Sequence, residues 1–428
     1  LDALAADGVR FSSAFCTAPQ CSPSRAALFT GRYPHSTGVM GLTHHGWDLS
    51  PSERHVASLL GEAGYRTDLI GVHHESKRRP DAEVGVQLGF DHVDTVGGKP
   101  SECRADRVAD RAIDVLRARA AEPGQPFYLQ VGFMEPHRLA GAGFDGIAMG
   151  FIGDHIAPDD ELGVTIPSFL QDDEGTREEI AELQGAVRYV DSAIGRMFRA
   201  LEDLALTEKT IVVFTTDHGL ALPRAKGTLY DPGLETALIV RAPSLGWTGG
   251  RVASDLVSNV DVVPTLLEAA GVTDPSTMHG RSVAPALRGE VRDGMYRPRS
   301  TIFGEFTYHD YYEPIRCVRS QRYKLIVNFD HAMTHAAAST QSWRPRSTPH
   351  PNALDWSKRE VEFYDLHEDP LEVRNRATDP TVREVVDEMR QAMLDWMERT
   401  SDPLLDGPVP SPHYVRARAN LLSARNLP

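Results

Sequence analysis

A potential nucleophile and a potential anion-binding cation lie within five residues, in Cys21-Ser22-Pro23-Ser24-Arg25. Ser22 is a favourable N-cap, Pro23 suits the first turn of a helix, and Gly31 can end that helix. Cys21 would then precede a helix N-terminus, where backbone N–H groups without partners attract anions. Arg25 lies one turn further on, so its guanidinium can fold back to the same point. This stretch therefore predicts a sulfur nucleophile, an anion-binding backbone and a fixed cation at one place.

A carboxylate and an imidazole stand side by side at Asp217-His218, directly after the apolar stretch 210–215. Both side chains can ligate a divalent cation, and a turn or helix cap is the structural alternative for the pair. Lys226 follows nine residues after Asp217 and is either an anion contact or an ordinary loop lysine.

Two histidines, His74 and His137, follow predicted strands at 65–72 and 127–133. The ends of parallel strands are where α/β proteins place their ligands, so both are candidate site residues. The basic run 77–79 after His74 is either the lip of an anion site or a solvated charge cluster. His44 and His45 lie in a glycine-rich stretch, for which we expect a surface loop, and the lining of a pocket is the alternative.

The composition of the 428-residue chain is that of an ordinary globular protein, with 25% charged and 41% hydrophobic residues. Its formal net charge of -15 argues against a nucleic-acid or anionic-membrane partner. No apolar run is long enough to span a membrane, and four cysteines are too few for a disulfide framework. Because the sequence opens on Leu1 without an initiator Met or signal peptide, we expect an upstream piece that carries any targeting signal.

Helical and apolar extended stretches alternate through the first two thirds of the chain. This alternation predicts a mostly parallel sheet with helices on both faces. The predicted strands are 65–72, 127–133, 210–215 and 237–242. The predicted helices are 1–6, 52–63, 101–119, 176–204 and 261–270, and the stretch 139–169 is expected to form a long surface loop.

The pattern changes near residue 295, where short extended stretches in hairpins replace the alternation. Strands are predicted at 301–306, 315–318, 323–329 and 360–366, with a polar loop at 333–354 and a helix at 381–399. We therefore expect an α/β catalytic domain over 1–295 and a small antiparallel subdomain with one helix over 296–428. The Pro-rich tail after Ser401 is predicted to be extended.

The string from Cys21 to Arg32 matches C-x-P-S-R-x-x-x-x-T-G-R, and the chain thereby resembles the sulfatase family. The resemblance implies an alkaline-phosphatase-like α/β/α sandwich in which the cysteine is oxidised to formylglycine. The Thr216-Asp217-His218-Gly219 string is similar to the family's metal-binding element, and Lys226 to a lysine that contacts sulfate. His74 and His137 match histidines that assist the nucleophile and contact the leaving group.

Several strings further along resemble the sulfamidase branch of this family. They are Leu229-Tyr230-Asp231-Pro232-Gly233, His279-Gly280-Arg281-Ser282, Ile302-Phe303-Gly304, Ile315-Arg316-Cys317-Val318-Arg319 and Tyr364-Asp365-Leu366. The resemblance thus implies hydrolysis of sulfate esters or sulfamates on a sulfated sugar such as N-sulfoglucosamine. Lys77 and Arg138 are the expected additional substrate contacts.

The resemblance also implies partners and cofactors. The first is a divalent metal bound by Asp217, His218 and the Cys21-derived side chain, for which we expect Ca²⁺, with Mg²⁺ or Mn²⁺ as alternatives. The second is a formylglycine-generating enzyme that matures Cys21. A homodimer is one expected assembly, and cytoplasmic and exported locations both stay open.

Two departures from the family pattern matter. Val72 stands where the family has a lysine, two residues before His74, so one expected sulfate contact is replaced. The family's Asp-Asp pair at the end of a first strand has no counterpart, because Asp159-Asp160 and Asp172-Asp173 read as caps or solvated charge. The sequence is thus expected to carry half of the metal site and to lack a central strand.

Two rival functions follow from these features. The first is a phosphonate or phosphate monoester hydrolase with the same nucleophile, which an Asp-His pair in place of Asp-Asn favours. The second is a non-catalytic binder of sulfated glycans.

Overall fold

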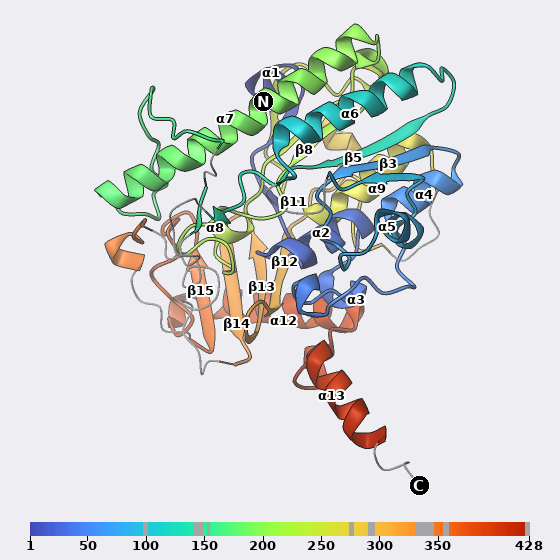
Figure 1. Ribbon diagram of the computed structural model, residues 1–428. Helices are drawn as coiled ribbons and strands as arrows, with labels where there is room; N and C mark the ends of the chain where they lie inside the picture. The colour runs from blue at the N-terminus through green and yellow to red at the C-terminus, as the bar shows by residue number, and fades with distance from the viewer. Residues whose placement is uncertain are drawn as a thin grey trace.

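The structure is a computed structural model that describes residues 1–96, 102–140, 149–151, 155–273, 278–289, 296–330, 346–353 and 359–423. Figure 1 shows β-strands between helices α6 and α7 on one side and α2, α4 and α9 on the other. A separate antiparallel sheet lies beside them, and the C-terminal helix α13 projects away. No helix among the described residues is long and apolar enough to cross a membrane.

One sheet has the strand order β10-β1-β9-β8. Its strands are β1 (Val9–Phe11), β8 (Val212–Thr215), β9 (Leu238–Arg241) and β10 (Arg251–Ala253). β1 and β10 are parallel, but β9 runs antiparallel to both of its neighbours. The prediction of a parallel fourth strand at 237–242 is therefore wrong in direction. The connection from β8 to β9 holds only the one-turn helix α8 (Asp231–Leu234), whereas a parallel partner needs a crossover connection.

The second sheet is fully parallel, in the order β4-β3-β5. Its strands are β3 (Arg66–Gly71), β4 (His92–Asp94) and β5 (Phe127–Gly132). Helices α5 (Asp81–Leu88) and α6 (Ala105–Ala120) connect them, which confirms the predicted helix–strand repeats. β3 and β5 approach so closely that a Cβ on Gly132 would lie 1.9 Å from the carbonyl oxygen of Val72. Glycine is required there by this close approach.

The remaining helices of this part surround the two sheets. They are α1 (Asp2–Asp7), α2 (Cys21–Thr30), α3 (Pro34–Thr37), α4 (Val56–Glu62), α7 (Glu174–Asp203), α9 (Val262–Ala270) and α10 (Ala284–Arg288). Asp173 caps α7 by accepting from the Thr176 N–H at 2.8 Å, which confirms a cap at this Asp pair. The helix predicted from Ser52 starts only at Val56, because the imidazole of His55 accepts the Ala57 N–H and acts as the N-cap.

Short strand pairs complete the sheets. β2 (Ala14–Phe15) pairs in parallel with β11 (Val257–Ser258). The predicted surface loop at 139–169 contains the pair β6 (Leu139–Ala140) and β7 (Met149–Gly150), and its residues 141–148 and 152–154 lie outside the described residues.

The C-terminal sheet is antiparallel, in the order β12-β13-β14-β15. Its strands are β12 (Thr301–Tyr308), β13 (Tyr312–Ser320), β14 (Tyr323–Asn328) and β15 (Val361–Asp365). Helix α12 (Arg383–Thr400) packs against it, with the ring of Trp396 stacked on Phe303 at 4.9 Å. The predicted fold class, mixed α/β with a small antiparallel C-terminal sheet and one packed helix, is confirmed. Most of the predicted loop at 333–354 lies outside the described residues.

The prediction of an extended tail after Ser401 is wrong, because residues Pro412–Ser423 form helix α13. A proline at its first position, followed by eleven residues without proline or glycine, favours a helix. None of its side chains is buried, so apolar burial contributes little to this helix.

One partly buried histidine links the segment after α2 to the loop after α9 and gives stability a pH dependence. The Nδ1 atom of His279 accepts the Tyr33 N–H at 3.0 Å. Burial, together with the charges of Arg32, His35 and Arg399, lowers the pKa of His279 to about 3. A histidine with a depressed folded-state pKa takes up its proton in the unfolded chain first. The contribution of His279 to stability is therefore fully present above about pH 6.5, and it is lost as the pH drops towards 3.

Replacing His279 with Gln should flatten this dependence. We expect the difference in unfolding free energy between pH 7 and pH 5 to shrink by about 1 kcal/mol, allowing for the partial exposure of the ring. Urea unfolding of both proteins at the two pH values measures it. Parallel pH profiles for wild type and H279Q would contradict this role.

Candidate active site

Helix α2 presents Cys21 in its first turn. The predicted stop is confirmed, since Gly31 adopts the left-handed conformation with φ 68°. The predicted N-cap is wrong: Gln20 occupies that position in extended conformation, and it makes no side-chain cap bond. The hydroxyl of Ser22 accepts the N–H of Thr43 at 3.1 Å instead, so it anchors a neighbouring loop rather than its own helix.

The thiol of Cys21 lies among cationic groups from distant parts of the chain. Its Sγ is 3.3 Å from Nε2 of His218 and 3.4 Å from Nζ of Lys226. Burial by itself raises the pKa of Cys21, but the charges of Lys226 and His218 and hydrogen bonds from His137 and His218 outweigh it. The pKa therefore lies well below its ordinary value, and this position stabilises a negative charge.

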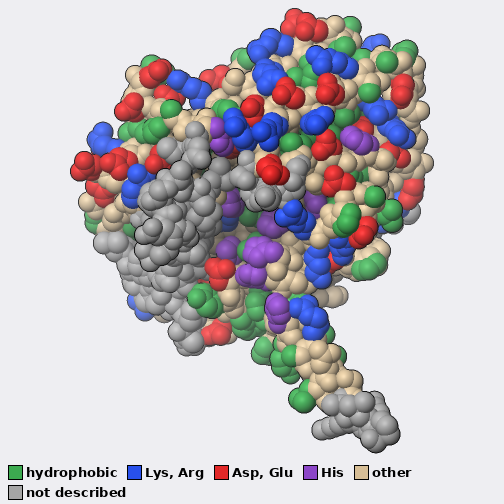
Figure 2. Space-filling view, in the orientation of Figure 1, with side chains coloured by type: hydrophobic (Ala, Val, Ile, Leu, Met, Phe, Trp, Pro, Cys, Tyr) green, Lys and Arg blue, Asp and Glu red, His purple; other side chains and the backbone are tan. Residues whose placement is uncertain are grey.

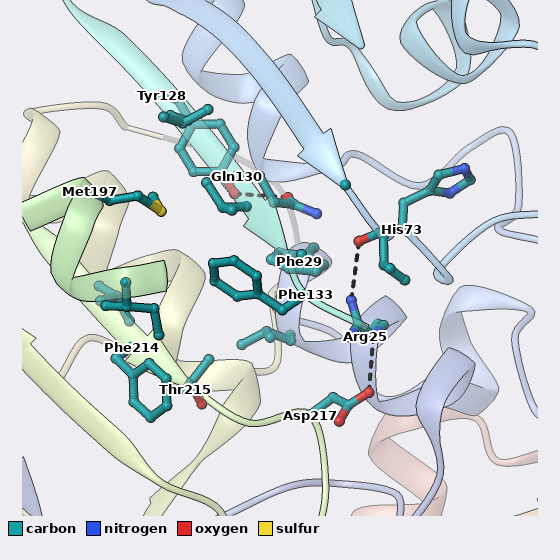
Figure 3. Close-up of a pocket in the computed structure, with 18 of the residues that line it drawn as sticks. Arg25, Phe29, His73, Tyr128, Gln130, Phe133, Met197, Phe214, Thr215 and Asp217 are labelled. Atoms are coloured by element: carbon teal, nitrogen blue, oxygen red, sulfur yellow. Dashed lines mark hydrogen bonds and ion pairs between the residues drawn. The ribbon is translucent and has the colours of Figure 1, made fainter. Parts of the chain in front are cut away.

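Arg25 and Asp217 form an ion pair beside the thiol, with Nε 2.9 Å from Oδ2. The guanidinium also reaches the carbonyl oxygen of Val72 at 3.5 Å, so it bridges the ends of β3 and β8 (Figure 3). Burial opposes ionisation of Asp217, yet the charges of His218 and Arg25 lower its pKa. The carboxylate is thus ionised at the end of β8, as the sequence pattern predicts for a ligand position.

The ring of His218 is oriented by its own backbone. Its Nδ1 lies 2.8 Å from the carbonyl oxygen of Gly219, so Nδ1 donates and Nε2 faces Cys21. Burial lowers the pKa of His218, but the Asp217 charge more than compensates and the pKa is raised. This position therefore favours a positive charge.

The donor atoms of Cys21, Asp217 and His218 all lie within 4.8 Å of one another. A carboxylate oxygen and an imidazole nitrogen suit a hard or borderline divalent cation, and the second ring nitrogen of His218 is already fixed by a carbonyl, as metal-bound histidines usually are. Each oxygen of Asp217 accepts one hydrogen bond and keeps a lone pair. The residues present therefore fit one face of a divalent metal site.

Lys226 is held by a loop that the C-terminal sheet fixes in place. Its side chain is buried, five residues before Asp231. The carboxylate of Asp231 accepts from Arg319 at 2.9 and 2.8 Å and pairs with Lys324 at 2.6 Å. Lys324 in turn pairs with Glu372 at 2.7 Å. Strands β13 and β14 thus set the position of the lysine that contacts Cys21.

The predicted histidines reach the site in different ways. His137 follows β5, and its Nδ1 lies 2.7 Å from the Arg138 carbonyl oxygen while the ring also hydrogen-bonds with Cys21. His74 lines the same pocket, where its ring stacks on that of His44 with centroids 5.9 Å apart. The surface loop expected for His44 and His45 is thus part of the pocket's mouth. Figure 2 shows histidines gathered at this hollow.

A family model described as "Sulfatase" matches residues 1–272, which is more than half of the chain. The chain belongs to the sulfatase family. A second model, "N-sulphoglucosamine sulphohydrolase, C-terminal", matches residues 221–339. A curated relative, human N-sulphoglucosamine sulphohydrolase, is 29% identical over 95% of this chain and 86% of its own. Human arylsulfatase A is 27% identical over 88% of this chain and 77% of its own.

Solved structures support the alkaline-phosphatase-like sulfatase fold. One, a protein in complex with its substrate D-glucosamine-2-N,6-O-disulfate, has a TM-score of 0.69 at 20% identity, over 94% of this chain and 92% of that one. Another is a phosphonate monoester hydrolase from Silicibacter pomeroyi. It has a TM-score of 0.66 at 21% identity, over 94% of this chain and 90% of that one. The predicted fold and family are confirmed. The family generally uses a metal and formylglycine, and both belong to the proposal below.

Two residues expected to contact substrate have other partners in this sulfatase. Lys77 lies 4.0 Å from Asp48, which also pairs with Arg79, and so belongs to a half-exposed ion cluster. Arg138 is buried, donates to Glu179 and to the Ala221 carbonyl oxygen, and lies over the Phe151 ring at 4.2 Å. Arg138 therefore has a buried counter-charge in Glu179, and its role as a substrate contact stays a prediction.

Replacing Arg138 with Met should destabilise the protein by about 3–5 kcal/mol, because the Glu179 carboxylate is left buried without its counter-charge. Urea unfolding measures the loss, and KM of the fraction that stays folded should be unchanged. The matched control is Arg78→Met, an exposed arginine that lines the same pocket, which should leave stability unchanged. A higher KM for R138M at unchanged stability would instead show that Arg138 contacts the substrate.

Two supporting residues were not predicted. Asn259, before α9, donates from Nδ2 to the carbonyl and hydroxyl oxygens of Ser24 at 3.1 and 3.0 Å, and Ser24 donates to the Asp217 carbonyl. Glu75 is buried, accepts the His74 N–H at 2.8 Å and the Gln130 amide at 3.1 Å, and so holds the loop after β3. An acidic residue within the basic run 73–79 is the signal for Glu75, whereas Asn259 gives none because its contacts are long-range.

Proposed function

We propose that this sulfatase hydrolyses the sulfamate of an N-sulfated glucosamine. The observation that carries the proposal is the contact of Cys21, within the sulfatase string, with both His218 and Lys226 beside the Arg25–Asp217 ion pair. The match of residues 221–339 to the N-sulphoglucosamine sulphohydrolase C-terminal model supports the sulfamate over other sulfates.

The sulfate group would bind between the two fixed cations. Lys226 is buried, and Arg25 uses Nε for Asp217 and Nη1 for the Val72 carbonyl oxygen, so further N–H groups of both side chains can donate hydrogen bonds to sulfonyl oxygens. Preorganised donors stabilise the charge that develops on these oxygens in the transition state. Asp217 keeps Arg25 in place and balances part of this positive charge.

Formylglycine at position 21 and a divalent cation held by Asp217 and His218 would supply an oxygen nucleophile and Lewis-acid activation. His137 is placed to handle the proton. Because its Nδ1 is fixed by the Arg138 carbonyl, Nε2 is the atom that exchanges a proton. As the oxygen nucleophile forms a bond to sulfur and the sulfur–nitrogen bond breaks, Nε2 would give its proton to the leaving amine. Glucosamine would leave first, and sulfate would be released when its bond to position 21 breaks.

The sugar would lie at the mouth of the pocket, against His44 and His74. Their stacked rings offer a flat surface and exchangeable N–H groups to hydroxyl oxygens. Val72 stands where relatives have lysine, and here its carbonyl oxygen accepts from Arg25 instead. The exposed Arg78 lines the pocket after His74, and its guanidinium would meet an anionic substituent of the substrate there.

A phosphonate or phosphate monoester hydrolase is the second candidate, because the pair Asp217-His218 replaces Asp-Asn. The same cationic pocket accepts a tetrahedral phosphoryl group. The fold similarity to a phosphonate monoester hydrolase is compatible with this candidate and does not decide it.

Turnover of N-sulfoglucosamine, an aryl sulfate and an aryl phosphonate by the purified protein with Ca²⁺ tests the proposal. Sulfate release should be fastest from N-sulfoglucosamine. Faster phosphonate hydrolysis would favour the second candidate, and binding of sulfated sugar without release would leave only a glycan binder. The mass of the tryptic peptide 11–25 shows in the same sample whether Cys21 is a thiol or an aldehyde.

A further inference from the structure

The C-terminal helix α13 starts from a segment that is firmly fixed to the body of the protein. The carbonyl oxygen of Val409 accepts from the Tyr308 hydroxyl at 2.7 Å, and the Val409 N–H donates to the Tyr312 hydroxyl at 3.1 Å. Val409 is buried and belongs to the same core cluster as Trp47. The start of α13 therefore has a defined place, although none of the helix's own side chains is buried.

Arg416 of α13 lies against the loop at the mouth of the active-site pocket. A Cβ atom on Gly46 would stand 3.1 Å from Nη1 of Arg416 and 3.3 Å from Cβ of Pro412, so glycine leaves room for this close contact. Gly46 follows His44, which lines the pocket, by only two residues, a span of at most about 7 Å. Figure 2 shows histidine and arginine side chains where α13 leaves the body, beside the histidines of the hollow.

The guanidinium of Arg416 has no ion-pair partner among the described residues. Its Nη2 donates to Nδ1 of His413, one turn earlier, at 2.9 Å. The stretch 412–428 contains three arginines and no acidic residue, whereas the whole chain has a net charge of -15. An uncompensated positive charge therefore stands beside the mouth of the pocket in a protein that is acidic as a whole.

The two faces of α13 differ in their side chains. Since residues three and four positions apart share a face of a helix, His413, Arg416 and Asn420 lie together on the face turned to the mouth. Arg418 comes two residues after Arg416 and so points to the opposite face, which it shares with Tyr414. The helix thus carries one arginine at the mouth and one of equal exposure away from it.

We propose that Arg416, with His413 and Asn420, forms a subsite for an acidic sugar linked to the one that carries the sulfamate. This inference rests on the proposed function, which places the first sugar against His44 at the pocket's mouth. A second sugar would leave the pocket past the neighbouring glycine and meet the polar face of α13. The guanidinium has five N–H groups and uses one for His413, so it can donate to both oxygens of a carboxylate.

Binding to the Cys21→Ala variant tests this inference separately from turnover. The probes are a disaccharide of N-sulfoglucosamine linked to a uronic acid, and the same compound with its carboxyl group reduced to an alcohol. By calorimetric titration at low salt, the acid should bind about five-fold more tightly than the alcohol, and this ratio should shrink in about 0.5 M salt. Equal affinities, or binding of neither compound, would overturn the subsite. Sulfate release from N-sulfoglucosamine by the wild type still tests the proposed function alone.

Matched variants in the same background separate a specific contact from general attraction. Arg416→Ala should reduce the affinity ratio to about one, and Arg416→Lys should keep part of it as a single charge without the planar fork. Arg418→Ala, the same change on the opposite face, should keep the full ratio. An equal loss of the ratio in both alanine variants would overturn the subsite. So would a dimer that dissociates on Leu421→Asp, at the exposed Leu421, if the two disaccharides bind equally, since α13 would then serve a second copy.

Discussion

Replacing Cys21 with Ala should lower kcat for N-sulfoglucosamine hydrolysis by a factor on the order of 10⁴ or more. The Sγ atom of Cys21 lies at the start of α2, contacts His218 and Lys226, and has a depressed pKa. Alanine removes this atom. Stability should change little, because the Cys21 side chain lines the pocket and belongs to none of the apolar clusters of the core among the described residues. Sulfate release under substrate saturation, with circular dichroism as a folding check, measures the effect.

Cys103→Ala is the matched control, since Cys103 is also buried but packs in the cluster around α6, away from the cationic groups. It should keep wild-type turnover and lose only a modest amount of stability. Full activity in C21A would rule out position 21 as the nucleophile, whatever the substrate proves to be.

Replacing Asp217 with Asn should lower kcat/KM by about 10³-fold. The amide has the shape of the carboxylate but no charge, so it can neither fix Arg25 as an ion pair nor balance a divalent cation beside His218. The Ca²⁺ concentration for half-maximal activity should rise about 10- to 100-fold in the variant. Activity measured against Ca²⁺ in chelator-buffered solutions gives both quantities.

Asp159→Asn provides the comparison for this variant. Asp159 pairs with Arg188 on the surface, and its loss should change neither turnover nor the Ca²⁺ requirement. An unchanged Ca²⁺ midpoint in D217N would show that Asp217 holds Arg25 but binds no metal.

The sequence predicts those parts of the site that depend on short-range patterns. The Cys21 helix, its stop at Gly31 and the carboxylate after β8 all follow from neighbouring residue types. Features set by distant partners do not follow from such patterns. Ser22 has the side chain of a good N-cap, but its hydroxyl oxygen accepts a hydrogen bond from the Thr43 N–H instead. Arg138 has the charge of a substrate contact, but a residue 41 positions away neutralises it.

Strand direction shows the same limit. An apolar run such as 237–242 reads alike in parallel and antiparallel sheets, and only the length of its connection distinguishes them. The connection before β9 is long in residues, yet most of it forms the loop that carries Lys226 rather than a crossover helix. In the sequence, a functional loop of this length looks like a crossover. The pocket role of His44 depends on its stack with His74 across 30 residues, which no local pattern contains.

The bonds from Asp231 to Arg319 and Lys324 bear on how the chain unfolds. The lysine beside Cys21 is placed by residues that lie about 90 positions later, and Lys324 and Glu372 have no exposed side-chain surface at all. Heating should therefore give a single calorimetric transition, with activity and C-terminal structure lost at the same temperature. A gene ending near residue 300 would encode a product that binds no sulfate, even with every catalytic side chain present.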